Sequence, residues 1–254
     1  MNQFNKFHSA ISIEKLSDSS FKITPDRDYF VWNTPHGGYL KAVMNNALVT
    51  CLPHSTSISS SIQYLDRTEA KDAFLEVDIL KVGRGSSSGF VKLIQDDKVR
   101  ATLTGTCSDF EHMKGFDGLN TAMPEIFNDD NHNQYKSLNY DMISEGFTPS
   151  FIKQLDCRVH PNHAWWDRSD REESAEARCS AFLEMSGGLA DQFCLFYYSD
   201  ILPPVVSNKY GALGWIPTIT LTTHIRMMPT TSKLFADFRA SDIRKGYFEQ
   251  DARI

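Results

Sequence analysis

The sequence has no long apolar run. No stretch reaches the ~18 residues that a membrane-spanning helix needs. The first 15 residues also lack the apolar core of a secretory signal. We therefore expect a soluble cytoplasmic protein without a membrane span.

Cysteine is scarce, and the common catalytic and metal motifs are missing. The chain has five cysteines, an odd number with no C-x-x-C pair, which indicates reduced thiols that lie mostly in the core. His160, His163 and Asp167 invite a metal interpretation, but no third and fourth ligand with good spacing follows. Gly85–Gly89 matches the G-x-S-x-G of a nucleophile elbow, yet both flanks are strand-like and indicate a hairpin turn. We expect no metal and no cofactor.

Positive charge is not in excess either. The formal net charge is -6 at pH 7, so the chain has no general attraction to nucleic acid or to an anionic membrane. The remaining composition is ordinary, with 41% hydrophobic and 23% charged residues among 254. Such a chain buries a real core and fits one large domain or two small ones.

One pattern of residues occurs twice. Phe30–Tyr39, which contains a His-Gly-Gly, leads into a helix expected at 38–51, where apolar residues recur at helical spacing. Ser186–Leu189, with a second Gly-Gly, leads into a helix expected at 188–201. Strand-like segments follow each helix in the same order. We expect them at 55–65, 73–82, 89–96 and 98–107 in the first half, and at 217–228, 233–242 and from 247 onward in the second.

The second repeat stops one strand earlier than the first. We therefore expect either a chain that is cut short or a repeat that is incomplete. The stretch between the halves has little periodicity and is interpreted as a connector. The predicted organisation is an N-terminal unit at 1–110, a connector at 111–150 and a C-terminal unit at 151–254, which opens with strands at 151–160 and 176–185.

Asp200 is a candidate for chemistry by its position. It follows Phe193, Phe196 and Tyr197 at helical spacing and so shares their apolar face. A carboxylate on a core-facing stripe is costly unless it is paired or used, which suits a general base. The alternative is that Asp200 turns outward and bonds the backbone of the turn at 201–204, and the sequence leaves both interpretations open.

Two other patterns also have a functional and a structural interpretation. The glycines of His36-Gly37-Gly38 let a ligand approach, and free amides at a helix start bind an anion or a carbonyl oxygen. A simple glycine turn with His36 as a structural hydrogen bonder explains the same residues. The threonines at 218, 220 and 222 share one face of a strand, which is ordinary unless one hydroxyl meets Asp200.

Together these residues resemble a known family. Asn33–Leu40 looks like the His-Gly-Gly helix start of a hotdog-fold acyl-CoA thioesterase, and 75–85 and 104–109 resemble the following strands. Tyr197–Pro204 and Gly214–Thr222 resemble the second hotdog of the double-hotdog, acyl-CoA thioesterase II-like group. The resemblance implies an α+β double hotdog, with two repeats of a long helix wrapped by an antiparallel sheet.

The resemblance also implies a site. In that family an Asp on the second helix, a Thr at the start of the next strand and a Gln on the final strand hold a water that attacks the thioester carbonyl. Asp200 and Thr218 fall on the first two positions. The Gln has no match, because its strand would lie beyond Ile254 and Gln250 sits one strand too early. The substrate-binding residues expected near the first helix are Asn33, His36, Gly37 and Gly38.

The first half lacks the same set of residues. Counted from the Gly-Gly pairs, Thr50 takes the place of Asp200, and Asn45 stands where many single-domain hotdog thioesterases carry an acid. This asymmetry fits one working site per chain. The expected reaction is hydrolysis of acyl-CoA or a similar acyl thioester in lipid metabolism, with Asp200 as general base and Thr218 positioning the water.

Two rival functions stay open. The first is a catalytically inactive acyl-CoA-binding or scaffold double hotdog, which the missing last strand favours. The second is a hydratase or dehydratase, which wants an Asp and a His a few residues apart, whereas no His follows Asp200 before His224. The sequence does not specify the acyl chain length or whether the protein forms a homo-oligomer.

Overall fold

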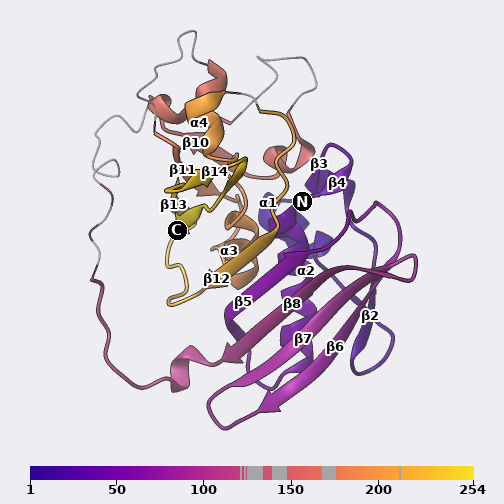
Figure 1. Cartoon of the computed structure of the whole chain (residues 1–254). Coiled ribbons are helices and arrows are strands. Elements are labelled where there is room, and N and C mark those ends of the chain that lie inside the picture. The colour runs from indigo at the N-terminus through magenta and orange to yellow at the C-terminus, as the bar shows by residue number, and fades with distance from the viewer. Residues whose placement is uncertain (121, 123, 125–133, 139–147, 168–175, 212) are drawn as a thin grey trace.

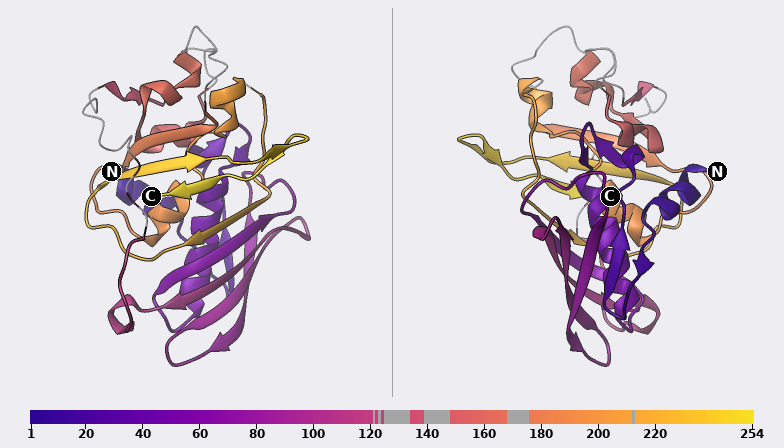
Figure 2. Two further views of the ribbon diagram at one scale, coloured as in Figure 1. Left: turned by 60° about the vertical axis from the view of Figure 1, so that its left-hand side comes forward. Right: turned by 90° about the vertical axis from the view of Figure 1, so that its right-hand side faces the viewer.

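The computed structural model describes residues 1–254 except 121, 123, 125–133, 139–147, 168–175 and 212. A large sheet, built mostly from the first half, curves around helix α2 (Gly37–Cys51), and a smaller sheet from the second half lies beside it (Figures 1 and 2). None of the helices in the described part of the chain is long and apolar enough to cross a membrane. The α-helices are α1 (Gln3–Ala10), α2 (Gly37–Cys51), α3 (Gln192–Tyr198) and α4 (Val206–Tyr210).

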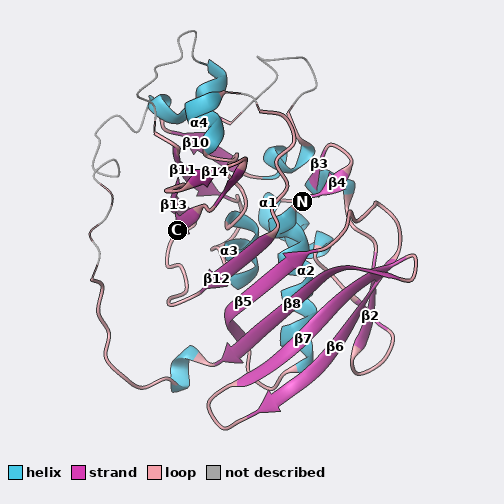
Figure 3. Cartoon of the chain, viewed as in Figure 1, coloured by secondary structure: helices cyan, strands magenta, loops and turns pink. Residues whose placement is uncertain are grey.

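The large sheet has seven strands in the order β1-β2-β6-β7-β8-β5-β12, and every neighbouring pair is antiparallel. A separate hairpin, β3 (Phe30–Val31) with β4 (Thr34–Pro35), precedes α2 (Figure 3). The four long strands of the first half match the sequence prediction within two residues at each end. The bounds of the sheet strands are β1 (Glu14–Lys15), β2 (Ser20–Ile23), β5 (Thr56–Tyr64), β6 (Ala73–Val82), β7 (Ser87–Gln95), β8 (Lys98–Ser108) and β12 (Thr220–His224).

The smaller sheet has five strands in the order β16-β13-β11-β10-β9, again antiparallel throughout. A short hairpin, β14 with β15, leads from β13 to β16. The strands are β9 (Lys136–Ser137), β10 (Asp156–Val159), β11 (Arg178–Glu184), β13 (Lys233–Arg239), β14 (Ile243–Arg244), β15 (Tyr247–Phe248) and β16 (Asp251–Arg253).

The two halves repeat one order of elements. Helix α3 corresponds to α2, and β12, β13 and β16 follow it as β5, β6 and β7 follow α2. In the first repeat β8 lies between β7 and β5. Among the described residues no strand takes that place between β16 and β12, as the sequence predicted.

One strand pair joins the repeats. Strand β12 from the second half pairs with β5 from the first, with Thr222 opposite Ser61, and we call this pair of strands the seam. Helix α2 lies beneath the seam and packs against both α3 and the large sheet. The seam thus brings the chain just before β12 close to the first repeat.

The sequence prediction differs from the structure around the second helix. The expected helix at 188–201 is shorter, because the carboxylate of Asp191 accepts hydrogen bonds from the backbone N–H groups of Phe193 and Cys194 and so caps α3 at that point. Helices α1 and α4 were not expected. Much of the expected connector at 111–150 lies outside the described residues.

The core contains the apolar stripe of α2 and four of the five cysteines. All five cysteines are free, and Cys51 alone among them is only half-buried. Leu48 of α2 is fully buried and packs over Gly89 and Gly105, which face each other on β7 and β8. A Cβ atom at Gly89 would lie 2.7 Å from Leu48 Cδ1, and one at Gly105 would overlap Cδ2 of the same side chain. These glycines leave room for the helix against the sheet.

Gly105→Ala should therefore lower the free energy of unfolding by about 1–3 kcal/mol, the usual cost of an overpacked core. Leu48→Ala alone should cost about 2–5 kcal/mol through the cavity it creates. The double variant should lose less unfolding free energy than the sum of the two single losses, since the shortened side chain at 48 makes room for the new methyl group at 105. Denaturant unfolding measures all three. Gly85→Ala is the control, because no atom lies within 4 Å of the new Cβ there. If the losses of the two single variants simply added up in the double variant, the packing argument would be contradicted.

Candidate active site

Asp200 lies between the two repeats. It follows the C-terminal end of α3, and its carboxylate faces the N-terminal end of α2. Oδ2 accepts a hydrogen bond of 3.1 Å from the backbone N–H of Gly38, and Oδ1 accepts one of 3.1 Å from the hydroxyl of Thr218. The side chain is 18% exposed, so the carboxylate is held by the protein and still reachable. Asp200 thus points inward, not to the turn at 201–204.

The two helices approach closely at the glycine pair. A Cβ atom at Gly38 would lie 2.5 Å from the carbonyl oxygen of Tyr197 and 2.9 Å from that of Phe196. A Cβ atom at Gly37 would lie 2.5 Å from Asp200 Oδ2. Both positions need glycine because a side chain would push α3 and the carboxylate away. The glycine turn therefore has a packing role in addition to any role toward a ligand.

His36 holds the backbone at Asp200. Its Nδ1 accepts a hydrogen bond from the N–H of Tyr39, so the ring proton is on Nε2, which donates to the carbonyl oxygen of Asp200 at 2.8 Å. Only 3% of the residue is exposed, and it stacks on Phe151 at 4.2 Å. Burial lowers the pKa of His36, while the nearby Asp200 opposes that shift. The imidazole is a neutral structural group.

Two other residues, Tyr64 and Asn33, lie near the N-terminal end of α2. The hydroxyl of Tyr64, on β5, donates to the carbonyl oxygen of Gly37 at 2.7 Å. Burial raises the pKa of Tyr64 well above its ordinary value, so the phenol stays protonated. Asn33 lies exposed in the β3–β4 turn, where its carbonyl oxygen accepts a hydrogen bond from Arg67. Asn33 is therefore exposed, whereas the other predicted site residues are partly or fully buried.

Lys41 is a residue that the sequence reasoning missed. It lies on α2 and is completely buried, and its ammonium donates to Ser60 O at 3.2 Å, Leu221 O at 2.8 Å and Thr223 Oγ1 at 2.6 Å. Burial lowers the pKa of Lys41 from an ordinary 10.5 to about 7, and Asp200 partly opposes this. The sequence did carry a signal for Lys41, because its spacing from Met44 and Leu48 places it on the buried face of α2.

The first repeat has its own version of the Asp200 arrangement. His36 caps α2 and Asp191 caps α3, and Asn45 and Asp200 each come nine residues after the cap. Ser57 donates to Asn45 Oδ1 at 2.9 Å, as Thr218 donates to Asp200 Oδ1. The prediction that Thr50 corresponds to Asp200 is corrected, because α3 begins four residues later than expected. Asn45 and Ser57 are fully buried.

Two sequence patterns have structural roles. Ser87, in the middle of the G-x-S-x-G, begins β7 after the predicted hairpin, and its hydroxyl lies 2.9 Å from His54 Nδ1. Ser87 is fully buried, so this Ser–His pair is closed to a substrate. His160 Nδ1 accepts from the N–H of Asn162, and His163 Nδ1 accepts from the N–H of Ser180.

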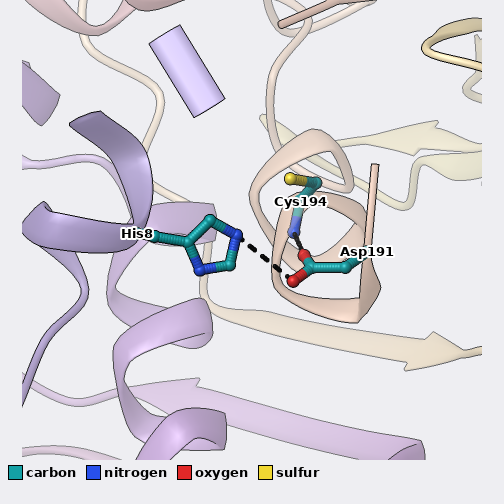
Figure 4. A group of neighbouring side chains, drawn as sticks. All are labelled: His8, Asp191 and Cys194. Carbon is teal, nitrogen blue, oxygen red and sulfur yellow. Dashed lines mark hydrogen bonds and ion pairs between the residues drawn. The ribbon is translucent and has the colours of Figure 1, made fainter. Parts of the chain in front are cut away.

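One group of potential metal-ligating atoms occurs among the described residues: His8, Asp191 and Cys194 (Figure 4). Asp191 uses one carboxylate oxygen to cap α3, and its other oxygen lies 3.2 Å from Nε2 of His8. Burial raises the pKa of the Cys194 thiol. Because both carboxylate oxygens of Asp191 already have partners, in the cap and in His8, we interpret the group as a helix cap and an attachment of α1.

Comparisons with known proteins identify the family of the chain. Residues 27–108 match a model for the acyl-CoA thioesterase N-terminal domain, and residues 129–254 match one for the acyl-CoA thioesterase C-terminal domain. Together the two models cover most of the chain, in the order of the two repeats. The chain belongs to the acyl-CoA thioesterase family. No curated protein matches the sequence significantly.

Solved structures show the same fold in other members of this structural class. A proposed thioesterase II from Thermobifida fusca YX has a TM-score of 0.80 at 20% identity, and the match covers 97% of this chain and 90% of that one. A hot dog fold protein of unknown function from Alicyclobacillus acidocaldarius has a TM-score of 0.81 at 17% identity, and the match again covers 97% of this chain and 90% of that one. The tesB protein of Mycobacterium avium subs paratuberculosis has a TM-score of 0.72 at 15% identity, and the match covers 96% of this chain and 88% of that one. The predicted α+β double hotdog is confirmed.

The burial of Lys41 predicts a pH dependence of stability. Between pH 7 and about 10 the unfolded chain holds a proton on Lys41 that the folded chain has released. The cost of burying the charge is thus fully present below pH 7 and disappears as the pH rises toward 10.5. Relative to Lys41→Met, the wild type should gain up to about 1.4 kcal/mol of unfolding free energy per pH unit in this window. Denaturant unfolding measures the gain; parallel curves for the two proteins would contradict it.

Proposed function

We propose that the protein hydrolyses acyl-CoA or a similar acyl thioester, with Asp200 as the catalytic base. The observation that supports this most is the Asp200 carboxylate, which accepts from Thr218 and from Gly38, in a chain of the acyl-CoA thioesterase family. The two residues that the sequence proposed for catalysis, one after α3 and one before β12, are joined by a hydrogen bond, which supports the proposal.

The proposed reaction adds water to the thioester carbonyl. Asp200 takes a proton from the water, the water oxygen bonds to the carbonyl carbon, and the carbon–sulfur bond then breaks. The proton returns to the departing thiolate, so the products are a carboxylic acid and coenzyme A. The Thr218 hydroxyl orients the carboxylate and the water. General base catalysis of this kind contributes ~10²–10⁴ in rate.

The start of α2 supplies the other side of this proposed site. The Gly37 N–H is at the first position of α2, where amides have no acceptor within the helix, and the helix dipole adds positive potential there. We propose that it stabilises the oxyanion that forms on the thioester carbonyl. Asn33 contacts the substrate at the rim, and His36 acts by holding the Asp200 backbone.

A hydratase is the second candidate, because the structure brings His36 Nε2 within 3.6 Å of Asp200 Oδ2. The sequence had counted against a hydratase for lack of such a pair. Both ring nitrogens of His36 already have protein partners, however, and the ring is neutral and buried. A general acid or base must reach the substrate, so hydrolysis remains the better proposal.

Three less specific expectations also belong to this proposal. Five free cysteines fit a reducing cytoplasm, where acyl-CoA esters of lipid metabolism occur. The proposed units are 1–110 and 151–254 with a connector at 111–150, although β9 within that connector pairs with β10 of the smaller sheet. The proposed partner is an acyl thioester and neither nucleic acid nor membrane, while the oligomeric state is left open.

Asp200→Asn should lower the turnover of acyl-CoA by ~10² or more, because the amide keeps the size of the side chain and loses its basicity. Binding of acyl-CoA should survive. Release of free thiol over a panel of short to long acyl chains measures turnover, and calorimetry measures binding. Unchanged turnover would remove Asp200 from the mechanism. A wild type that binds acyl-CoA but turns over no chain length would support the inactive acyl-CoA-binding alternative.

Thr218→Val should lower kcat by about tenfold, since one hydrogen bond to the base is lost. Thr222→Val is the matched control, because its hydroxyl bonds Ser61 across the exposed seam, away from Asp200. Its kcat should stay within twofold of the wild type. Equal losses in both variants would show that the seam, and not the contact with Asp200, matters.

A further inference from the structure

We propose that Trp32, Trp215 and Arg67 bind the nucleotide end of coenzyme A, with the adenine base on the tryptophan rings and a phosphate group at the arginine. The inference rests on the proposed function, since it names the place for the part of an acyl-CoA substrate that does not react. We call these three side chains the tryptophan–arginine surface.

The two tryptophans come from different repeats and pack against each other. Trp32 lies in the β3–β4 turn and Trp215 lies in the segment before β12. Their ring centroids are 5.9 Å apart, and the ring planes meet at 51°. Trp32 is nevertheless 42% exposed and Trp215 51% exposed, although tryptophan is highly buried on average. The pair therefore presents aromatic surface to the solvent.

The backbone at Trp32 has a conformation that a tryptophan rarely adopts. The β3–β4 hairpin closes with the two residues Trp32 and Asn33, between the paired Val31 and Thr34. Trp32 has a φ of 52°, in the left-handed region where glycine and asparagine are the usual residues of such turns. Residues held in this region against their preference concentrate at functional sites. The turn itself does not call for a tryptophan, which favours a role for the exposed ring toward a ligand.

Arg67 brings a positive charge to the same turn. Its exposed guanidinium donates to the carbonyl oxygen of Asn33 at 2.9 Å, which fixes it beside Trp32. The neighbouring carboxylate of Asp66 forms an ion pair with Arg100, and within the described part of the chain Arg67 has no carboxylate partner. A guanidinium has five N–H donors, so most of them remain for an anion. Phosphate is an anion that this group binds well.

The tryptophan–arginine surface adjoins the proposed active site along the chain on both sides. Trp215 precedes Thr218 by three residues, so the two Cα atoms lie within ~11 Å of each other. Trp32 precedes His36 by four residues, which limits that separation to ~15 Å. Thr218 and His36 both bond Asp200. In acyl-CoA the long pantetheine arm joins the thioester to the nucleotide, so a nucleotide site is expected near the carboxylate but separate from it.

The acyl chain is the competing occupant of this surface. An acyl chain is apolar, gains most when it is removed from water completely, and has no use for a cation. Adenine instead has a flat π-face that stacks on an aromatic side chain, and the phosphate groups of coenzyme A are recognised by arginine. Half-exposed aromatic rings beside an arginine therefore fit the nucleotide better than the acyl chain.

Calorimetric titration with coenzyme A tests the surface without turnover. Trp215→Leu and Arg67→Gln should each weaken the binding of coenzyme A by about fivefold or more, through loss of a stacked base or of a charged contact. Tyr247→Leu and Arg244→Gln are the matched controls, because both side chains are exposed and their residues pair across the β14–β15 hairpin. The controls should stay within twofold of the wild type. A wild type that does not bind coenzyme A, or equal effects in variants and controls, overturns the proposal.

A comparison of two substrates with the same acyl group, acyl-CoA and acyl-pantetheine, separates the nucleotide from the acyl chain. Trp215→Leu and Arg67→Gln should lower kcat/KM for acyl-CoA by about fivefold or more and leave kcat/KM for acyl-pantetheine within twofold. Equal losses on both substrates that grow with acyl length would assign the surface to the acyl chain and overturn the proposal. A wild type that hydrolyses neither substrate, while the variants still weaken the binding of coenzyme A, refutes the proposed hydrolysis and keeps the nucleotide site.

Discussion

The contact between α2 and α3 at Gly38 is the constraint on which the site depends. The backbone of α3 comes so near to Gly38 that any side chain there would overlap it. The same approach lets the N–H of Gly38 bind the carboxylate of Asp200, where the positive end of the α2 dipole favours a negative charge. His36 reinforces the contact from the cap position. Helix packing and carboxylate binding are therefore one arrangement.

The fold was largely readable from the sequence because the repeat and the strand periodicity are strong. Strand β6 was predicted with both of its ends correct, and so was the order of the main helix and the long strands, but not α4 or the β14–β15 hairpin of the second repeat. The start of α3 was misplaced, because the cap at Asp191 competes with a glycine pair that resembles a helix start. Capping depends on a backbone geometry that a spacing count does not contain.

The site was only partly readable. Asp200 and Thr218 were singled out, but their contact follows from the seam, which brings the start of β12 to the end of α3. The hydrogen-bond partners of Lys41 could not be predicted, because two of the three lie 180 and 182 residues away. Such long-range partners have no local sequence signature.

Because the two halves belong to one chain, assembly of the proposed site does not require two molecules to meet. Each half contributes to one site: the first supplies the α2 amides, and the second supplies Asp200 and Thr218. Two separate chains would have to find each other to build it and would fall apart on dilution. Here the polypeptide itself keeps the halves at a high effective concentration. The contacts of the proposed site are therefore all made within one chain.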